Sequence, residues 1–282
     1  MTTARKREAG KTLRRRRPDA SVRRCCRLLG LHRSAVYYRT SRATRDAALT
    51  KELLALARKH PRFGYRRMTV LLNRAGWQVN AKRVARVWRE AGLNIPNRKV
   101  RKRRLGHSGN GIQRHRPERP NHVGSYDFVS DQTEDGGRLK ILVVIHEFTR
   151  RVLSLRCARS LRGVDVIDEL HRLFAHYGLP EHIRSDNGPE FISKAVRVHL
   201  AQLSVGTRYI EPGSPWENGY VESFNSRLRE QLLDRELFHN LNEATVLLEA
   251  HRKTFNGARP HSALGKLTPN EFYAAQMGRD HR

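Results

Sequence analysis

The sequence has few cysteines, no long apolar run and few acids for its number of bases. Its three cysteines, Cys25, Cys26 and Cys157, are odd in number and have no C-x-x-C spacing, which argues against a disulfide framework. The 14 histidines do not join the cysteines in a zinc-ligand spacing. No apolar stretch approaches the roughly 20 residues that a transmembrane helix needs. The basic N-terminus also lacks an apolar signal core. These absences predict an intracellular protein without a membrane span.

Acidic residues are scarce beside basic ones. Lys and Arg number 56 against 27 for Asp and Glu, so the 282 residues carry a formal net charge of +29. Self-repulsion of this size destabilises a compact fold unless a polyanion is bound. Nucleic acid is the natural partner, and binding should weaken steeply as salt rises. An anionic membrane surface is the alternative, but no amphipathic anchor is visible in the sequence.

The first helical region is expected within residues 1–58. Residues 1–19 are predicted to be a mobile basic tail. A short helix is expected over Ser21–Leu29, broken by Gly30, and the chain can restart as a helix over Arg33–Tyr38. This pattern predicts a helix-turn-helix-like segment, although a plain helical hairpin has the same signature.

A second helical region is predicted over residues 59–93. Apolar spacing indicates helices over Arg66–Ala75 and Ala81–Ala91. Asn80 is a good N-cap for the latter, and Gly92 is a natural C-terminal stop. The polar face of the latter helix is basic, which predicts DNA contact, with a solvated helix face as the alternative. The predicted DNA-binding residues of this face are Lys82, Arg83, Arg86 and Arg89.

Residues 94–121 read as a basic linker rich in Gly and Pro, and residues 122–275 as a core domain. The core begins with three predicted strands in series and continues with alternating helices and strands. This order predicts an α/β fold with a mixed sheet flanked by helices. The predicted strands are Val123–Ser130, Arg138–Ile145, Arg151–Cys157, Glu181–Arg184 and Thr207–Ile210. The predicted helices are Gly163–Tyr177, Pro189–Leu203, Glu217–Leu233 and Leu241–Phe255.

Three acids of this core can be placed on different elements. Asp127 lies in the first predicted strand, Asp186 follows the fourth, and Glu222 lies in the helix that begins near Glu217. Carboxylate oxygens suit Mg²⁺, which keeps part of its shell for water and substrate phosphate. In so basic a chain, three convergent carboxylates predict a divalent-metal site that acts on phosphodiesters.

Several segments carry a family resemblance, which spans about Ser21 to Phe272. The chain resembles the catalytic (OrfB-type) proteins of bacterial insertion-sequence transposases of the insertion-sequence-three family, which are of the DDE type related to retroviral integrases. The segments that carry it are Asn121–Asp131, Ile183–Gly188, Tyr209–Asn225 and Arg259–Ser262.

The resemblance implies that residues 122–275 are a ribonuclease-H-like integrase catalytic core behind a small all-α, helix-turn-helix DNA-binding region. It implies that Asp127, Asp186 and Glu222 are catalytic and hold two Mg²⁺ or Mn²⁺ ions. Expected partners are DNA (the terminal inverted repeats and the target), further copies of the chain, and the product of an upstream reading frame, fused or paired. The expected location is the bacterial cytoplasm, at the nucleoid. Arg229, seven residues after Glu222, is expected to contact terminal DNA; the alternative is an intrahelical charge pattern with Glu230.

Two positions depart from the family's pattern. The family usually has tryptophan where this chain has Gly124 and aspartate where it has His146. A catalytically decayed DNA-binding protein is therefore one alternative to an active transposase. A ribonuclease H with an added binding domain is another, although the helical pairs upstream argue against it.

Overall fold

The structure is a computed structural model that describes residues 3–37, 42–94, 117–185, 194–209 and 218–277. The chain forms two compact units. One consists of Met1–Met68 with Val79–Ile95, and the other of Thr69–Gln78 with Pro96–Arg282. No helix in the described ranges has both the length and the apolar character needed to cross a membrane.

The N-terminal part is helical throughout its described elements. These are α1 (Thr3–Arg16), α2 (Val22–Leu28), α3 (Arg33–Tyr37), α4 (Arg42–Lys59), α5 (Tyr65–Arg74) and α6 (Ala81–Glu90). The expectation of a mobile tail is wrong for Thr3–Arg16, which forms α1 and packs on α2 and α3. Its Ala, Leu, Lys and Arg residues are strong helix formers, and this propensity outweighs the repulsion between like charges.

The two predicted helical pairs are confirmed. Ser21 accepts a hydrogen bond from the backbone of Arg24 at the start of α2. At the start of α6, Asn80 Oδ1 accepts one from the backbone N–H of Arg83 at 2.8 Å. Gly92 follows α6 with φ of +69°, the left-handed conformation that ends a helix at little cost for glycine. Local capping chemistry therefore sets these helix boundaries.

The region of residues 122–275 contains the predicted mixed sheet. Its strands are β1 (Val123–Gln132), β2 (Arg138–His146), β3 (Arg151–Ala158), β4 (His182–Ser185) and β5 (Gly206–Tyr209). The strand order is β3-β2-β1-β4-β5. β1–β2 and β2–β3 are antiparallel pairs, whereas β1–β4 and β4–β5 are parallel. β2 lies inside the sheet and is buried on both faces, which explains its unbroken apolar run Ile141–Ile145.

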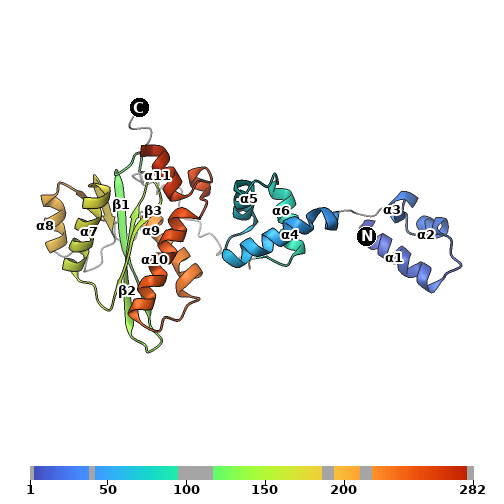
Figure 1. The fold of residues 1–282 in the computed structure, drawn as a ribbon, viewed down its shortest axis with the longest axis horizontal. Helices are drawn as coiled ribbons and strands as arrows, with labels where there is room; N and C mark the ends of the chain where they lie inside the picture. The colour runs from blue at the N-terminus through green and yellow to red at the C-terminus, as the bar shows by residue number, and fades with distance from the viewer. Residues whose placement is uncertain (1–2, 38–41, 95–116, 186–193, 210–217, 278–282) are drawn as a thin grey trace, which may run out of the picture. The chain divides into compact units, whose positions relative to one another are not determined.

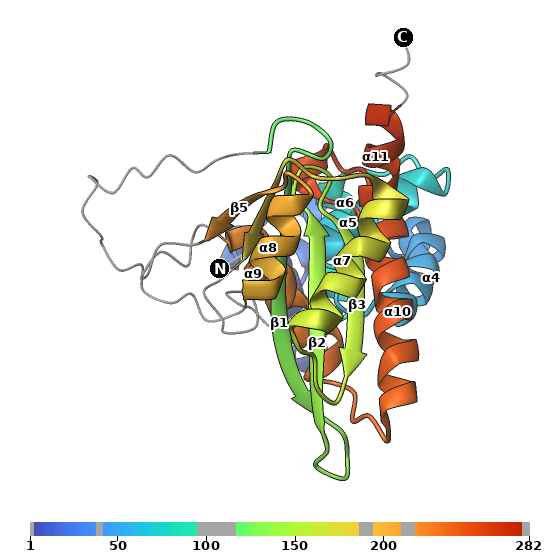
Figure 2. The same ribbon diagram turned by 90° about the vertical axis from the view of Figure 1, so that its left-hand side faces the viewer.

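Helices cover both faces of this sheet (Figure 1). The helices are α7 (Gly163–Tyr177), α8 (Lys194–Gln202), α9 (Gly219–Leu228), α10 (Leu241–Gly257) and α11 (Pro269–Met277). Figure 2 shows α7 in front of β1–β3, with α10 on the other side of the sheet. A first apolar cluster lies under α7 and α8, with Tyr126, Leu142 and Leu170 among its members.

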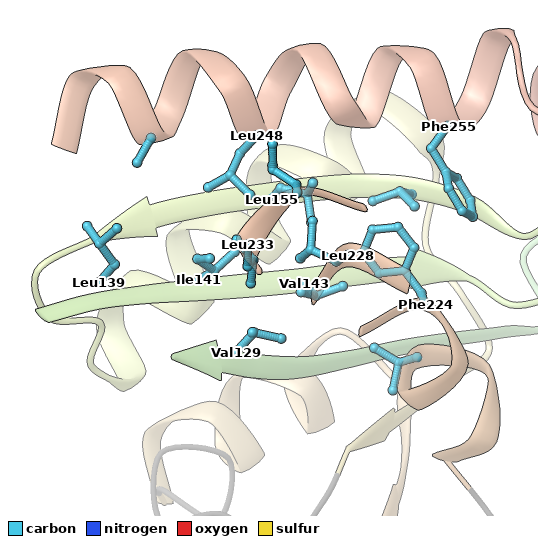
Figure 3. Close-up of a cluster of buried hydrophobic side chains, with 14 of the residues drawn as sticks. Val129, Leu139, Ile141, Val143, Leu155, Phe224, Leu228, Leu233, Leu248 and Phe255 are labelled. Atoms are coloured by element: carbon cyan, nitrogen blue, oxygen red, sulfur yellow. The ribbon is translucent and has the colours of Figure 1, made fainter. Parts of the chain in front are cut away.

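A second apolar cluster lies between the sheet and the helices α9 and α10 (Figure 3). Val129 and Val143 contribute from the strands, Phe224 and Leu228 from α9, and Leu248 from α10. After Leu228 the helix widens into a π-helical turn, Arg229–Leu233. This second cluster anchors α9 and fixes which of its faces meets β1.

Candidate active site

Asp127 is held in the middle of β1 by two hydrogen bonds. Its side chain is half-buried, on the α9 side of the sheet with Ser125 and Val129, as strand alternation requires. The backbone N–H of Phe128 donates to Oδ1 at 2.8 Å. Asn225 Nδ2 donates to Oδ2 at 2.7 Å. Asn225 therefore ties α9 directly to the strand carboxylate.

Glu222 lies on the face of α9 that meets Asp127. Its side chain is exposed, and it precedes Asn225 by three residues. Residues three apart on a helix are neighbours, with Cβ atoms about 5–6 Å apart. Asn225 touches Asp127, and Glu222 lies one turn earlier on the same face of α9. The structure thus brings two of the three predicted acids to one side of the sheet.

Asp186 lies outside the described residues. The strand before it is described: β4 runs parallel to β1, pairs with it at Val123–Ser125 and ends at Ser185. Ser185 is the residue immediately before Asp186. The topology therefore supports the expectation that the chain enters the Asp186 segment from the strand next to Asp127.

A buried ion pair lies beside this site. Arg184 is in register with Ser125, and its Nη1 donates to both oxygens of Glu147 at 3.0 and 3.1 Å. The Glu147 side chain is 0% exposed and that of Arg184 is 6% exposed. The pair was not predicted because its members lie 37 positions apart and Glu147 stands outside the segments that carry the family resemblance. It anchors β4 two residues before Asp186.

Arg229 occupies the start of the π turn. Its Nη2 donates to the backbone carbonyl of Ser130 on β1 at 2.9 Å, while the residue stays exposed. The contact places a cation near the strand that carries Asp127. Its predicted contact with terminal DNA stays a prediction.

The basic face of α6 divides into two kinds of residue. Lys82 and Arg89 are exposed. Arg83 Nε and Arg86 Nη2 instead donate to the two carboxylate oxygens of Asp46 on α4, at 2.9 and 2.6 Å. Burial raises the pKa of Asp46, but the hydrogen bonds from Arg86 and Arg83 outweigh it and hold the pKa below its usual value. Two of the four predicted DNA-binding residues therefore also join α4 to α6.

The two departures from the family pattern have ordinary surroundings. The backbone N–H of Asn121 donates to His146 Nε2 at 2.9 Å, and Nδ1 lies 2.9 Å from the Thr149 hydroxyl. Burial lowers the pKa of His146 to about 4, so the ring is neutral at pH 7. Gly124 alternates with Asp127 and faces the opposite side of the sheet, where the nearest atom to a built Cβ is Ile183 Cγ1 at 3.7 Å.

Among the described residues, one further group could hold a metal ion. The ligand atoms of His122, Glu181 and His182 all lie within 4.8 Å of one another, at the starts of β1 and β4. The Glu181 carboxylate already accepts hydrogen bonds from the guanidinium of Arg119. An ion there would have to compete with this pair, and the group lies at the opposite end of β4 from Asp186.

Sequence profiles assign families to both regions. Two profiles described as integrase core domain match residues 117–215 and 203–269. A profile described as HTH-like domain matches residues 44–104, which include α5 and α6. The solved core domain of HTLV-2 integrase in complex with magnesium is similar to 56% of this chain and 99% of its own, with 22% identity and a TM-score of 0.44.

Two curated relatives extend the similarity over most of the chain. A 31.7 kDa protein of insertion element IS407 from Burkholderia multivorans is 38% identical over 92% of this chain and 93% of its own length. The transposase of insertion sequence IS904 from Lactococcus lactis is 24% identical, over 79% of this chain and 92% of its own length. The chain therefore belongs to the insertion-element transposases of the insertion-sequence-three type, which join an HTH-like DNA-binding region to an integrase catalytic core of ribonuclease-H-like fold.

Proposed function

We propose that this chain binds the ends of its insertion element, nicks a 3′ end, and joins that end to target DNA. The observation that carries the proposal is the 2.7 Å hydrogen bond from Asn225 to Asp127. It places the Glu222 face of α9 over the strand that holds Asp127, while β4 leads into Asp186. The +29 charge supports a DNA substrate.

The donor chemistry of the site fits Mg²⁺ or Mn²⁺. Asp127 and Glu222 offer hard carboxylate oxygens, one from a half-buried strand and one from an exposed helix face. Two bound ions would supply Lewis-acid stabilisation to the attacking and leaving oxygens of an in-line displacement. Asp127, Asp186 and Glu222 are proposed as the ligands.

Other residues orient the Asp127 carboxylate or are proposed to contact DNA. Asn225 fixes the orientation of the Asp127 carboxylate by holding one oxygen, and the Phe128 N–H holds the other. Arg229 would contact terminal DNA from its place beside Ser130. Lys82 and Arg89 present exposed cations for end recognition, and Arg83 and Arg86 would join them if DNA displaces Asp46.

The assembly proposed on DNA contains more than one copy of the chain, together with the two element ends and the target. The product of an upstream reading frame is a further proposed partner, either fused or separate. The proposed location is the bacterial cytoplasm, at the nucleoid.

The test is a strand-transfer assay with the flanking inverted repeats and Mg²⁺ or Mn²⁺. Asp127→Asn, Asp186→Asn and Glu222→Gln should each abolish nicking and joining together, with end binding retained, because both steps share one site. Asp168→Asn is the matched control: this exposed acid is on α7, on the other side of the sheet. Near-normal joining by Glu222→Gln would show that the assignment is wrong.

The same assay separates the alternatives. A catalytically decayed DNA-binding protein would bind the ends without metal-dependent nicking. A ribonuclease H would cleave RNA–DNA hybrids with no preference for the element ends. His146 accepts a hydrogen bond from Asn121, and Gly124 leaves room for a Cβ, so neither position supplies an argument for a decayed site.

A further inference from the structure

A cavity of about 270 Å³ lies beside α9, on the side away from Glu222. It is bounded by α9, by the turn that precedes β3, by the end of α10 and by the segment around His261. The polar side chains that line it are Arg150, Tyr220, Ser223, Arg227 and His261. None of its described lining residues is an acid. A cavity with two guanidinium groups and no carboxylate favours an anion.

Helix geometry separates this cavity from the acid site. Tyr220, Ser223 and Arg227 follow the spacing of one helix face. Glu222 is two residues after Tyr220, which at 3.6 residues per turn is a rotation of about 200°. Ser223 and Arg227 are rotated from Glu222 by about 100° and 140°, so the cavity and Glu222 lie on different faces of one helix. The ligand of the cavity is not the phosphate that reacts at Glu222.

Arg150 is held in place by an aromatic ring. Its guanidinium carbon lies 3.5 Å from the centre of the Tyr220 ring, a stacked cation–π contact. Its Nη1 is buried without a hydrogen-bond partner in the described part of the chain. A buried donor left unsatisfied costs free energy, more so on a charged group. Arg150 also has φ of +61°, a conformation that a non-glycine residue adopts only under local constraint.

Arg227 places a second guanidinium at the cavity. Its Nη1 donates to the carbonyl and the hydroxyl of Ser223, one turn earlier. Burial lowers the pKa of Arg227, and the partial compensation comes from Glu230. A desolvated guanidinium gains more from an anion than an exposed one does, because the local dielectric is lower.

We propose that this cavity holds a backbone phosphate of DNA, bound through Arg150, Arg227 and the Ser223 hydroxyl. The planar forks of the two arginines match the geometry of phosphate oxygens. His261 lines the cavity, and its ring packs edge-on against Phe255 with the ring centres 4.9 Å apart. The proposal therefore gives the segment of residues 259–261 a role in substrate binding. The proposal rests on the proposed function, since its ligand is a DNA strand that passes behind α9 while another part of the substrate meets the acids.

The test measures end-DNA affinity over a salt series by fluorescence anisotropy with the full chain. Arg150→Asn removes the guanidinium and keeps a residue that tolerates positive φ. Arg227→Gln removes the second cation with little change of volume. Arg235→Ala is the control, an exposed arginine outside the cavity. Each cavity variant should weaken binding about tenfold, as expected for a charged hydrogen bond, and lower the salt slope by about one. The control should lose less than either.

Neutral methylphosphonates placed one at a time in the end DNA locate the contact. A methylphosphonate at one position should weaken binding by the wild-type protein and leave binding by Arg150→Asn unchanged. The reason is that the replaced phosphate and Arg150 are the two partners of a single interaction, which the variant has already lost. Equal sensitivity of both proteins at every position would overturn the proposal, as would wild-type affinity in both cavity variants. Thermal melting checks that the variants fold. If wild type binds ends but does not nick, the catalytic proposal fails while the cavity is still tested; if it binds no DNA, both fail.

Discussion

Asp46 decides whether Arg83 and Arg86 act mainly in folding or in DNA binding. Its side chain is 7% exposed, and the side chains of Arg83 and Arg86 are 38% and 30% exposed. Asp46→Asn keeps the volume and removes the charge. Removing one partner of a fully buried pair costs about 3–5 kcal/mol. Because both arginines can turn toward water, the cost here is discounted toward the value of surface pairs, to roughly 1–2 kcal/mol.

Hydrogen exchange read by mass spectrometry reports this loss locally. A loss of 1–2 kcal/mol in the opening free energy corresponds to roughly 5–30-fold faster exchange. Peptides from α4 and α6 should show it, while peptides from the β-sheet should not change. Lys82→Ala, on the exposed part of the same helix, is the matched control and should leave exchange in α6 unaltered.

Measuring DNA affinity distinguishes a DNA-binding role of the two arginines from a purely structural one. If phosphates compete with Asp46 for the arginines, Asp46→Asn releases two cations and should strengthen end binding even as α6 loosens. If the arginines serve only to hold α4 to α6, affinity should fall together with exchange protection. Unchanged exchange in Asp46→Asn would refute the structural role assigned to the ion pairs.

Three more perturbations test the core. Burial lowers the pKa values of His146 and His251 to about 4, against 6.5 unfolded, so the unfolded chain binds more protons between these pH values and the folded state loses stability below pH 6.5. Urea unfolding should show a loss of roughly 2 kcal/mol per histidine from pH 7 to pH 5, and His251→Gln should remove about half of the total loss. Equal unfolding midpoints at both pH values would contradict this. Arg184→Met removes the arginine that pairs with the fully buried Glu147 carboxylate and should cost about 3–5 kcal/mol in thermal melting, whereas adding Glu147→Gln should recover much of it; no recovery would mean that packing, not charge, sets the cost. Gly124→Ala has room for its Cβ and should stabilise the core by about 0.4–1 kcal/mol, while a lower melting temperature would show that the strand needs glycine.

Local signals in the sequence predicted the elements that depend on local chemistry. The run Ile141–Ile145 and the apolar stripe of α7 gave β2 and α7 within a residue of their observed bounds. The helix α4 was missed because its buried face combines Leu49 and Leu53 with the polar Asp46, which obscures the apolar period. Propensity outweighed charge in α1, against the expectation of a tail.

Only the site residues that stand in recognisable motifs could be predicted from the sequence. Asp127 and Glu222 stand in recognisable segments, and the structure brings them to one side of the sheet through Asn225. The Arg184–Glu147 pair and the stacking of Arg150 on Tyr220 join residues 37 and 70 positions apart. Such contacts depend on how strands and helices pack, which periodicity and spacing do not encode.

The order of the elements along the chain also determines when Asn225 can meet Asp127 during synthesis. β1, β2 and β3 are joined by short connections, so they can pair as soon as they leave the ribosome. The partner of Asp127 on α9 is encoded about a hundred residues later. At about 5–20 residues per second, that interval is on the order of 5–20 s. A nascent chain therefore completes its basic N-terminal helices before α9 can meet Asp127. Under the proposed function, such a chain can bind DNA before its catalytic site is assembled.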